Sequence, residues 1–535
     1  MKLSSKQTKL LFWVIFILAL VLRLWGIHHE LNDYHHFRQT YTAMFAKNFY
    51  EHGLNLFSPQ IDILNYKNVS EFQIYPFLVA ILYKIFGYHD ILGRLLSLFF
   101  SMATIGVLYR LIAYLLDEIT GLFGILLYAI LPLSVFYGRV FMLEPMMLFL
   151  SVSMIYTFTL YLDTEKTSYF ALAVLSTAGT LLIKIPTAYM LFPMLYLLIR
   201  KQGPGFLIRP RNYIFGILSI LPALYWYFLH ARFFPQDSIV DKELMGMYYS
   251  SDAWDYYIAL MKSSKTWKSI YLISIAEFHL AISGFLFFLG GVILLMKRWR
   301  NQSNFQKFEY NSGVWVFFYW YLGFNVFILS FIAPNLAHEY YQLPIILPSI
   351  GLASYYLRNA FEYALNMEKG GKKTAILAVN FLLLLGILPF SLNKINNRLQ
   401  QDTFYNDFSE QVRKLTSKED LVIIADNTPR TEVFYFSDRK GFQFIIPGAF
   451  QVYMEGIEES YQKQYIQELE ELRSQGGKYF LTPYVELPGF LPWLHAYLSE
   501  NYECKLGCEV TRERSLMRDR TIPGFIYDLS SPLKK

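Results

Sequence analysis

The sequence predicts a polytopic α-helical membrane protein with a C-terminal α/β domain outside the membrane. Three observations predict this class. Apolar residues make up 54% of the 535 residues and charged residues only 17%. Long apolar runs recur as far as residue 391, and beyond it the runs shorten and charges become frequent. Because about a quarter of the residues in a soluble protein are charged, much of this chain must contact lipid.

The composition also excludes several classes of protein. So much apolar sequence excludes intrinsic disorder. Two cysteines can build neither a disulfide framework nor a four-cysteine zinc site. The net charge of +6 comes with no basic block of the kind that binds nucleic acid, so no nucleic-acid partner is expected.

The apolar runs predict about eleven membrane-spanning helices, since each needs about 20 mostly apolar residues. The first is no cleaved signal peptide, because no small-residue cleavage site follows its long apolar run. The region 168–200 is the least regular, because Lys184 and Pro186 interrupt it. The predicted spans are residues 10–27, 92–115, 120–137, 143–162, 168–184, 186–200, 213–230, 270–296, 313–333, 341–357 and 373–391.

The orientation of the spans follows from the basic residues of short loops, which favour the cytoplasm. Four groups of Lys and Arg lie before residue 10 and near residues 200–212, 296–312 and 357–373. Placing all four in the cytoplasm puts the N-terminus there, in the plasma membrane. The segments that then lie outside are 28–91, 138–142, 231–269, 334–341 and everything after 391.

Residues 73–88 are apolar but too short to span, and they contain Pro76 and Lys84. They predict an interfacial or re-entrant helix on the outer face, inside a long first outer loop over 28–91. The chain therefore divides into a membrane domain, 1–391, and an extracytoplasmic α/β domain, 392–535. In the second domain we expect strands at 421–425 and 479–481 and helices at 458–474 and 490–498. Whether Cys504 and Cys508 form a disulfide stays open.

Polar residues gather at the predicted outer ends of the spans, where they are candidates for function. The opening loop contains Asp33, which can act as a general base, with Arg38 close by in sequence. A solvated interfacial loop is the alternative. A divalent metal is a further alternative, although the spacing fits no specific zinc pattern. Its ligands would be Asp33, His35, His36 and Glu144.

Further polar residues add charge at the same face. Arg139 precedes Glu144 and Pro145, and this pair either binds substrate or pins the turn as an ion pair. Lys184 either binds phosphate or reaches the headgroups. The run from His338 to Tyr341 is either part of a site or an aromatic belt. Together with Arg94 and Glu71, these groups could surround an anionic lipid headgroup whose phosphate the cations bind.

The order of these motifs resembles the GT-C membrane glycosyltransferases, in the branch of the protein O-mannosyltransferases and lipid A aminoarabinose transferases. The similarity covers about residues 10–360. Two positions depart from the pattern. Tyr34 follows Asp33 where many relatives have Glu, and the second acidic residue is Glu144 where Asp is common. The matching residues are Asp33-Tyr34-His35-His36-Phe37-Arg38-Gln39-Thr40, Glu71, Pro76, Phe86-Gly87, Arg94, Arg139, Glu144, Lys184, Pro186, His338, Tyr340, Tyr341 and Leu343-Pro344.

The resemblance implies a GT-C fold and transfer of a sugar from a polyprenyl-phosphate carrier to a hydroxyl group at the outer face, with inversion. Asp33 is implied as the base, and Glu144 as a second catalytic carboxylate. No cofactor is certain. The acceptor stays open between protein, lipid and glycan, as do the sugar and the oligomeric state. The residues implied to bind the donor are His36, Arg38, Gln39, Glu71, Arg94, Arg139, Lys184, His338, Glu339, Tyr340 and Tyr341.

Three alternative functions fit the same sequence. A transporter or flippase of lipid-linked sugars would need charged groups or broken helices near the bilayer midplane. A non-catalytic subunit would use residues 392–535 for interaction and would tolerate loss of Asp33 and Glu144. A ligase that joins larger glycans on the same carrier differs only in the size of its donor.

Overall fold

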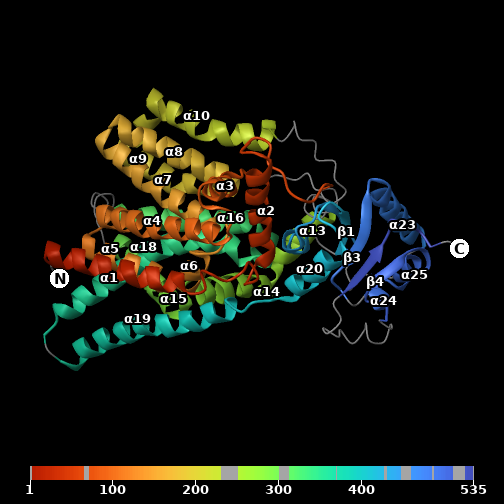
Figure 1. Ribbon diagram of the computed structural model, residues 1–535. Helices are drawn as coiled ribbons and strands as arrows, with labels where there is room; N and C mark the ends of the chain where they lie inside the picture. The colour runs from red at the N-terminus through yellow and green to blue at the C-terminus, as the bar shows by residue number, and fades with distance from the viewer. Residues whose placement is uncertain are drawn as a thin grey trace.

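The structure is a computed structural model, and helices dominate it. Figure 1 shows the helical bundle with a sheet at the end opposite the N-terminus, and helix α2 crossing between them. Residues 231–250 of the predicted outer segment 231–269, and 301–311 of a predicted basic loop, lie outside the described residues. The structure describes residues 3–65, 71–230, 251–300, 312–368, 370–426, 430–446, 459–484, 487–509 and 524–533.

Among the described residues, seven helices are long and apolar enough to cross a membrane. This confirms an integral membrane protein that is mostly helical, whereas the predicted number of eleven spans is not reproduced. The seven are α1 (Ser5–Leu24), α4 (Ile91–Leu115), α7 (Glu144–Thr164), α10 with its continuation (Pro210–Leu229), α15 (Ala281–Arg300), α16 (Gly313–Ser330) and α19 (Gly371–Arg398). Shorter apolar helices are α3 (Ile74–Phe86), α5 (Glu118–Ile130) and α8 (Thr167–Ile183).

Several predicted spans are divided, and prolines explain most of the divisions. Leu131 is extended before Pro132, so the predicted span 120–137 becomes two helices, because a residue before proline avoids helical geometry. At Ala281 the backbone turns with φ +50° and divides the predicted span 270–296. The pieces include α6 (Pro132–Tyr137), η1 (Ile185–Met190), α9 (Leu191–Gln202), η4 (Lys268–His279), α17 (Ile332–Ala337), η5 (Glu339–Ile345) and α18 (Ile346–Leu365).

The predicted first outer loop contains two helices, α2 (His36–His52) and α3. Helix α3 has 13 residues. At about 1.5 Å per residue it is too short to cross a core of about 30 Å, as expected for residues 73–88. Its position at the membrane interface stays a prediction. Residues 39–49 of α2 are all buried, because the helix is packed between the bundle and the C-terminal part of the chain.

The C-terminal part forms a five-stranded sheet in the order β2-β1-β3-β5-β4. Strand β1 pairs in parallel with β2 and β3, and β5 is antiparallel to β3 and β4. The predicted strands and helices all occur here. The elements are α20 (Phe404–Leu415), β1 (Leu421–Asp426), α21 (Glu432–Ser437), β2 (Gly441–Ile445), α23 (Glu459–Ser474), β3 (Gly477–Thr482), α24 (Leu487–Phe490), α25 (Pro492–Asn501), β4 (Glu503–Leu506) and β5 (Phe525–Asp528).

The structure refines the predicted domain boundary and answers whether Cys504 and Cys508 form a disulfide. The predicted boundary at residue 391 falls within α19, which continues unbroken to Arg398. Cys504 and Cys508 are joined by a disulfide. Disulfides persist in oxidising compartments, so this bond is consistent with the predicted extracytoplasmic position of the sheet.

The first outer loop is attached to the edge of the sheet. Ile63 forms a parallel bridge with Gly441 of β2, and the Gly441 N–H donates to the Asp62 carbonyl at 3.0 Å. Buried Asp62 also pairs with Lys47 of α2 at 3.3 Å. These contacts hold the sheet against the loop that carries Asp33.

Candidate functional site

The first candidate group surrounds Asp33, which lies fully buried in the turn between α1 and α2. Arg94 donates to both carboxylate oxygens, at 3.1 and 3.2 Å. Arg139 approaches Oδ2 at 2.8 Å, and the Gln39 amide donates to Oδ1. We call these four residues the aspartate cluster. Their four contacts fill about all the acceptor positions of one carboxylate.

The aspartate cluster keeps its carboxylate ionised. Burial alone would raise the pKa of Asp33, but the charges of Arg94 and Arg139 outweigh burial and hold that pKa below its usual value. Arg94 comes from the first turn of α4, and Arg139 from the turn after α6. Arg139 also donates to the Gly26 carbonyl at 3.1 Å and lies over the Phe136 ring.

Arg38 is close to Asp33 in sequence, but in the structure it pairs with Glu71. Helix α2 explains the difference. It begins at His36, so Gln39 and Arg38 project in different directions, about 100° apart. Gln39 therefore reaches Asp33, while Arg38 reaches the segment that precedes α3.

The second group surrounds Lys184, whose ammonium pairs with Glu144 Oε1 at 2.6 Å. The same ammonium lies 5.3 and 5.0 Å from the ring centres of Tyr340 and Tyr341. Lys184 occupies an extended position between α8 and η1, and its carbonyl accepts from the Thr187 N–H at 2.9 Å. The interruption of the helix at Lys184 and Pro186 thus places the lysine side chain against Glu144. The lysine cluster is defined as Arg38, Glu71, Glu144, Lys184, Tyr340 and Tyr341.

Several hydrogen-bonding positions in the lysine cluster are unused by the described residues. Arg38 Nε and Glu144 Oε2 are buried without a hydrogen-bond partner among them. Lys184 has three donors, and only the one to Glu144 is used in the described contacts. A small cavity of about 20 Å³ adjoins Lys184, Tyr340 and Tyr341. Buried donors without partners are costly, so this cluster is suited to an anionic ligand.

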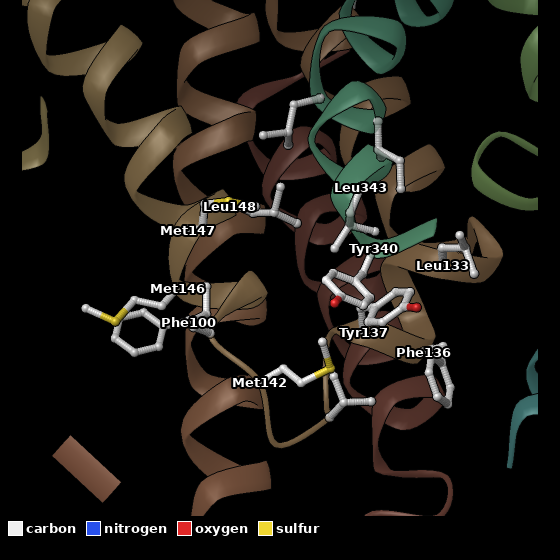
Figure 2. Close-up of a cluster of buried hydrophobic side chains, with 14 of the residues drawn as sticks. Phe100, Leu133, Phe136, Tyr137, Met142, Met146, Met147, Leu148, Tyr340 and Leu343 are labelled. Carbon is white, nitrogen blue, oxygen red and sulfur yellow. The ribbon is translucent and has the colours of Figure 1, made fainter. Parts of the chain in front are cut away.

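Glu339 was predicted to bind the donor, but its carboxylate is already engaged. Arg398, at the end of α19, donates to it at 2.7 and 3.0 Å, and the Tyr137 hydroxyl donates at 3.1 Å. The sequence analysis missed both partners, because Arg398 lies beyond the last predicted span and Tyr137 inside an apolar run. Figure 2 shows Tyr137 among the buried side chains that include Tyr340, Met142 and Leu343.

His35 is the residue whose role the sequence indicated least. It caps α2 in the left-handed conformation, with φ +60°, which is uncommon for a residue other than glycine. Its ring contacts those of Tyr137, His338 and Tyr340. Burial lowers the pKa of His35 to about 4, so the ring is neutral near neutral pH. Its Nε2 is buried with no partner among the described residues.

The lowered pKa of His35 predicts a pH-dependent stability. Between about pH 4 and 6.5 only the unfolded chain protonates this histidine, so the free energy of unfolding decreases as the pH falls through that range. In His35→Asn, which tolerates the left-handed backbone, this contribution is lost. The drop in Tm from about pH 7.5 to about pH 5 should be about 1–2 °C smaller than in the wild type. An unchanged drop in scanning calorimetry would contradict the lowered pKa.

The proposed metal ligands do not come together. Asp33 is held by arginines, Glu144 by Lys184, and His36 Nδ1 contacts Glu432 of α21 at 2.7 Å. Within the described ranges, no three His, Cys, Asp or Glu side chains are grouped to hold a metal ion. His36 therefore links the first loop to the sheet and does not line the lysine cluster.

The comparisons with known proteins match this fold. Residues 73–226 match the sequence profile of the dolichyl-phosphate-mannose-protein mannosyltransferases. That range includes Arg94, Arg139, Glu144 and Lys184, but not Asp33. A search of curated protein sequences finds no match.

Solved structures extend the similarity to nearly the whole chain. ArnT from Cupriavidus metallidurans, bound to undecaprenyl phosphate, superposes with a TM-score of 0.62 at 13% identity, covering 98% of each chain. The oligosaccharyltransferase AglB from Archaeoglobus fulgidus, in complex with an inhibitory peptide and a dolichol-phosphate, gives 0.55 at 11% identity, covering 93% of this chain and 72% of that one. At such identities the likeness establishes the fold, and it confirms the resemblance drawn from the motifs.

Proposed function

We propose, from the premise that this chain has the GT-C fold of membrane glycosyltransferases, that it transfers a sugar from a polyprenyl-phosphate carrier to a hydroxyl group. The acceptor site would lie at the outer face of the membrane. The structural similarity to ArnT and the family profile over residues 73–226 support this proposal. The structures of ArnT and AglB were solved with undecaprenyl phosphate and a dolichol-phosphate, which are carriers of this chemical class.

One observation carries the proposal: the lysine cluster holds buried donors with no partner among the described residues. Arg38 Nε and two of the three Lys184 donors are unused there. A phosphate offers several acceptor oxygens and a negative charge to match them. As the sugar leaves, charge grows on the phosphate, and the same cations would stabilise it in the transition state. Tyr340 and Tyr341 would border this phosphate site.

The reaction we propose is a direct displacement. The acceptor oxygen forms a bond to the anomeric carbon while the bond from that carbon to the phosphate oxygen breaks, which inverts the anomeric centre. Ionised Asp33 takes the proton of the acceptor hydroxyl. Because three hydrogen bonds and the Arg139 ion pair occupy this carboxylate, the acceptor hydroxyl must displace one of them. We expect Arg139 to yield, because its Nη2 lies close to Asp33 but makes no hydrogen bond.

Product formation tests the proposed function. The purified chain is placed in vesicles with host membrane extract and a panel of polyprenyl-phosphate sugars, and acceptors that gain a sugar are identified by mass spectrometry. We expect one donor to yield a glycosylated acceptor. Movement of a donor across the vesicle membrane with no product would instead establish a transporter. Binding of donor with neither outcome would contradict catalysis by this chain.

A further inference from the structure

A second cavity lies at the other end of the bundle, far along α1 and α4 from the candidate site. Its volume is about 590 Å³, within the range of small-molecule pockets. The first turns of α1, the last turns of α4 and Phe149 near the start of α7 border it. We call it the α1–α4 groove. The predicted orientation places it at the cytoplasmic side of the membrane.

The lining of the α1–α4 groove changes from polar to apolar along its length. Lys9 and Arg110 line it, both exposed and without an ion pair among the described residues. Four residues deeper on each helix, about 6 Å farther into the bilayer, come Trp13 and Gly106. Phe149 adds to this apolar part.

Two details of the polar end point to a ligand. Thr8 lines the groove with a side chain only 5% exposed, and its Oγ1 has no hydrogen-bond partner among the described residues. Glu118 is the one acidic residue of the lining, so the two cations leave a net positive charge. A hydroxyl without a hydrogen-bond partner, next to two cations without an ion pair among the described residues, is suited to bind an oxygen of an anionic headgroup.

We propose that the α1–α4 groove binds an anionic phospholipid of the cytoplasmic leaflet. Lys9, Arg110 and Thr8 contact its phosphate, and an acyl chain lies along Trp13 and Phe149. The charge of the polar end and the apolar depth of the groove match the two parts of such a lipid. This site is separate from the proposed sugar transfer, and neither proposal depends on the other.

Two variants separate the headgroup from the acyl chain. Lys9→Gln/Arg110→Gln removes both cations. Gly106→Leu fills the apolar part without a change of charge, because a Cβ at Gly106 meets no atom within 4 Å. The matched controls are Lys6→Gln/Lys372→Gln, which removes two exposed basic residues outside the groove, and Gly216→Leu, at another glycine with open space.

The full chain is reconstituted in vesicles of equimolar phosphatidylcholine and phosphatidylglycerol, extracted with mild detergent, and analysed by native mass spectrometry. We expect the wild type and both controls to retain phosphatidylglycerol in preference to phosphatidylcholine. In the double charge variant that preference should fall about thirty-fold, and Gly106→Leu should no longer retain the lipid. Equal retention of both lipids by the wild type, or undiminished retention of phosphatidylglycerol by Gly106→Leu, would overturn the proposal. Unchanged melting temperatures confirm that the variants fold.

Discussion

Asp33→Asn should lower sugar transfer by about a thousand-fold or more and also destabilise the protein. The amide cannot take the proton of the acceptor, and a general base contributes about 10²–10⁴ in rate. The variant also leaves Arg94 and Arg139, which are at most 1% exposed, without a counter-charge. Breaking a buried ion pair in this way costs about 3–5 kcal/mol. Transfer per folded molecule and thermal unfolding measure the two effects separately.

Asp62→Asn is the matched control for this prediction. Asp62 is also fully buried and pairs with Lys47 and Lys440, at the junction between the first loop and the sheet. Its loss should lower Tm by less than Asp33→Asn does, because Lys47 keeps Asp438 as a partner and Lys440 is exposed, and it should leave transfer per folded molecule unchanged. If Asp33→Asn retained more than about a tenth of wild-type transfer, the assigned role as proton acceptor would be wrong.

Lys184→Gln should weaken binding of the lipid-phosphate donor. We expect affinity for polyprenyl phosphate to fall about ten- to a hundred-fold, because a charge-assisted contact to phosphate contributes about 1.5–3 kcal/mol. The variant should also unfold more easily, since Glu144 is fully buried and would lose its direct ion pair with Lys184. Titration with polyprenyl phosphate measures the affinity.

The double variant Glu144→Gln/Lys184→Gln distinguishes binding from folding. Removing both charges restores neutrality, so much of the lost stability should return. Donor affinity should not return, because the phosphate still lacks its cation. Lys47→Gln, at a buried pair outside the lysine cluster, should leave donor affinity unchanged. Recovery of affinity in the double variant would show that Lys184 supports Glu144 and does not bind phosphate.

Much of the fold could be predicted because it depends on local pattern. Long apolar runs become helices, as α4 and α7 show. The predicted strands at 421–425 and 479–481 also occur. The predicted count of eleven spans is not confirmed, because hydropathy averages over breaks such as Leu131–Pro132 that divide the predicted spans into shorter helices. Such a break hardly changes the mean hydropathy, but it redirects the backbone.

The site was harder to predict, because its pairings depend on tertiary structure. Acidic and basic residues near the outer ends of spans could be named as candidates, but not matched to each other. Asp33 pairs with Arg94 and Arg139, which are 61 and 106 positions away in the chain, while neighbouring Arg38 pairs with Glu71. No sequence pattern indicated Arg398 as a candidate, since it lies at the end of a helix beyond the recognised motifs. The left-handed backbone of His35 and its buried Nε2 without a partner among the described residues appear only in the structure.

The most direct test of the proposed function is the release of free polyprenyl phosphate. The purified wild type and Asp33→Asn are supplied in parallel with a panel of polyprenyl-phosphate sugars and host membrane extract. We expect the wild type to release the carrier from one donor, and Asp33→Asn to bind that donor without releasing it. No release by the wild type from any donor, despite bound lipid, would contradict the glycosyltransferase proposal, whereas equal release by both proteins would contradict only the role of Asp33.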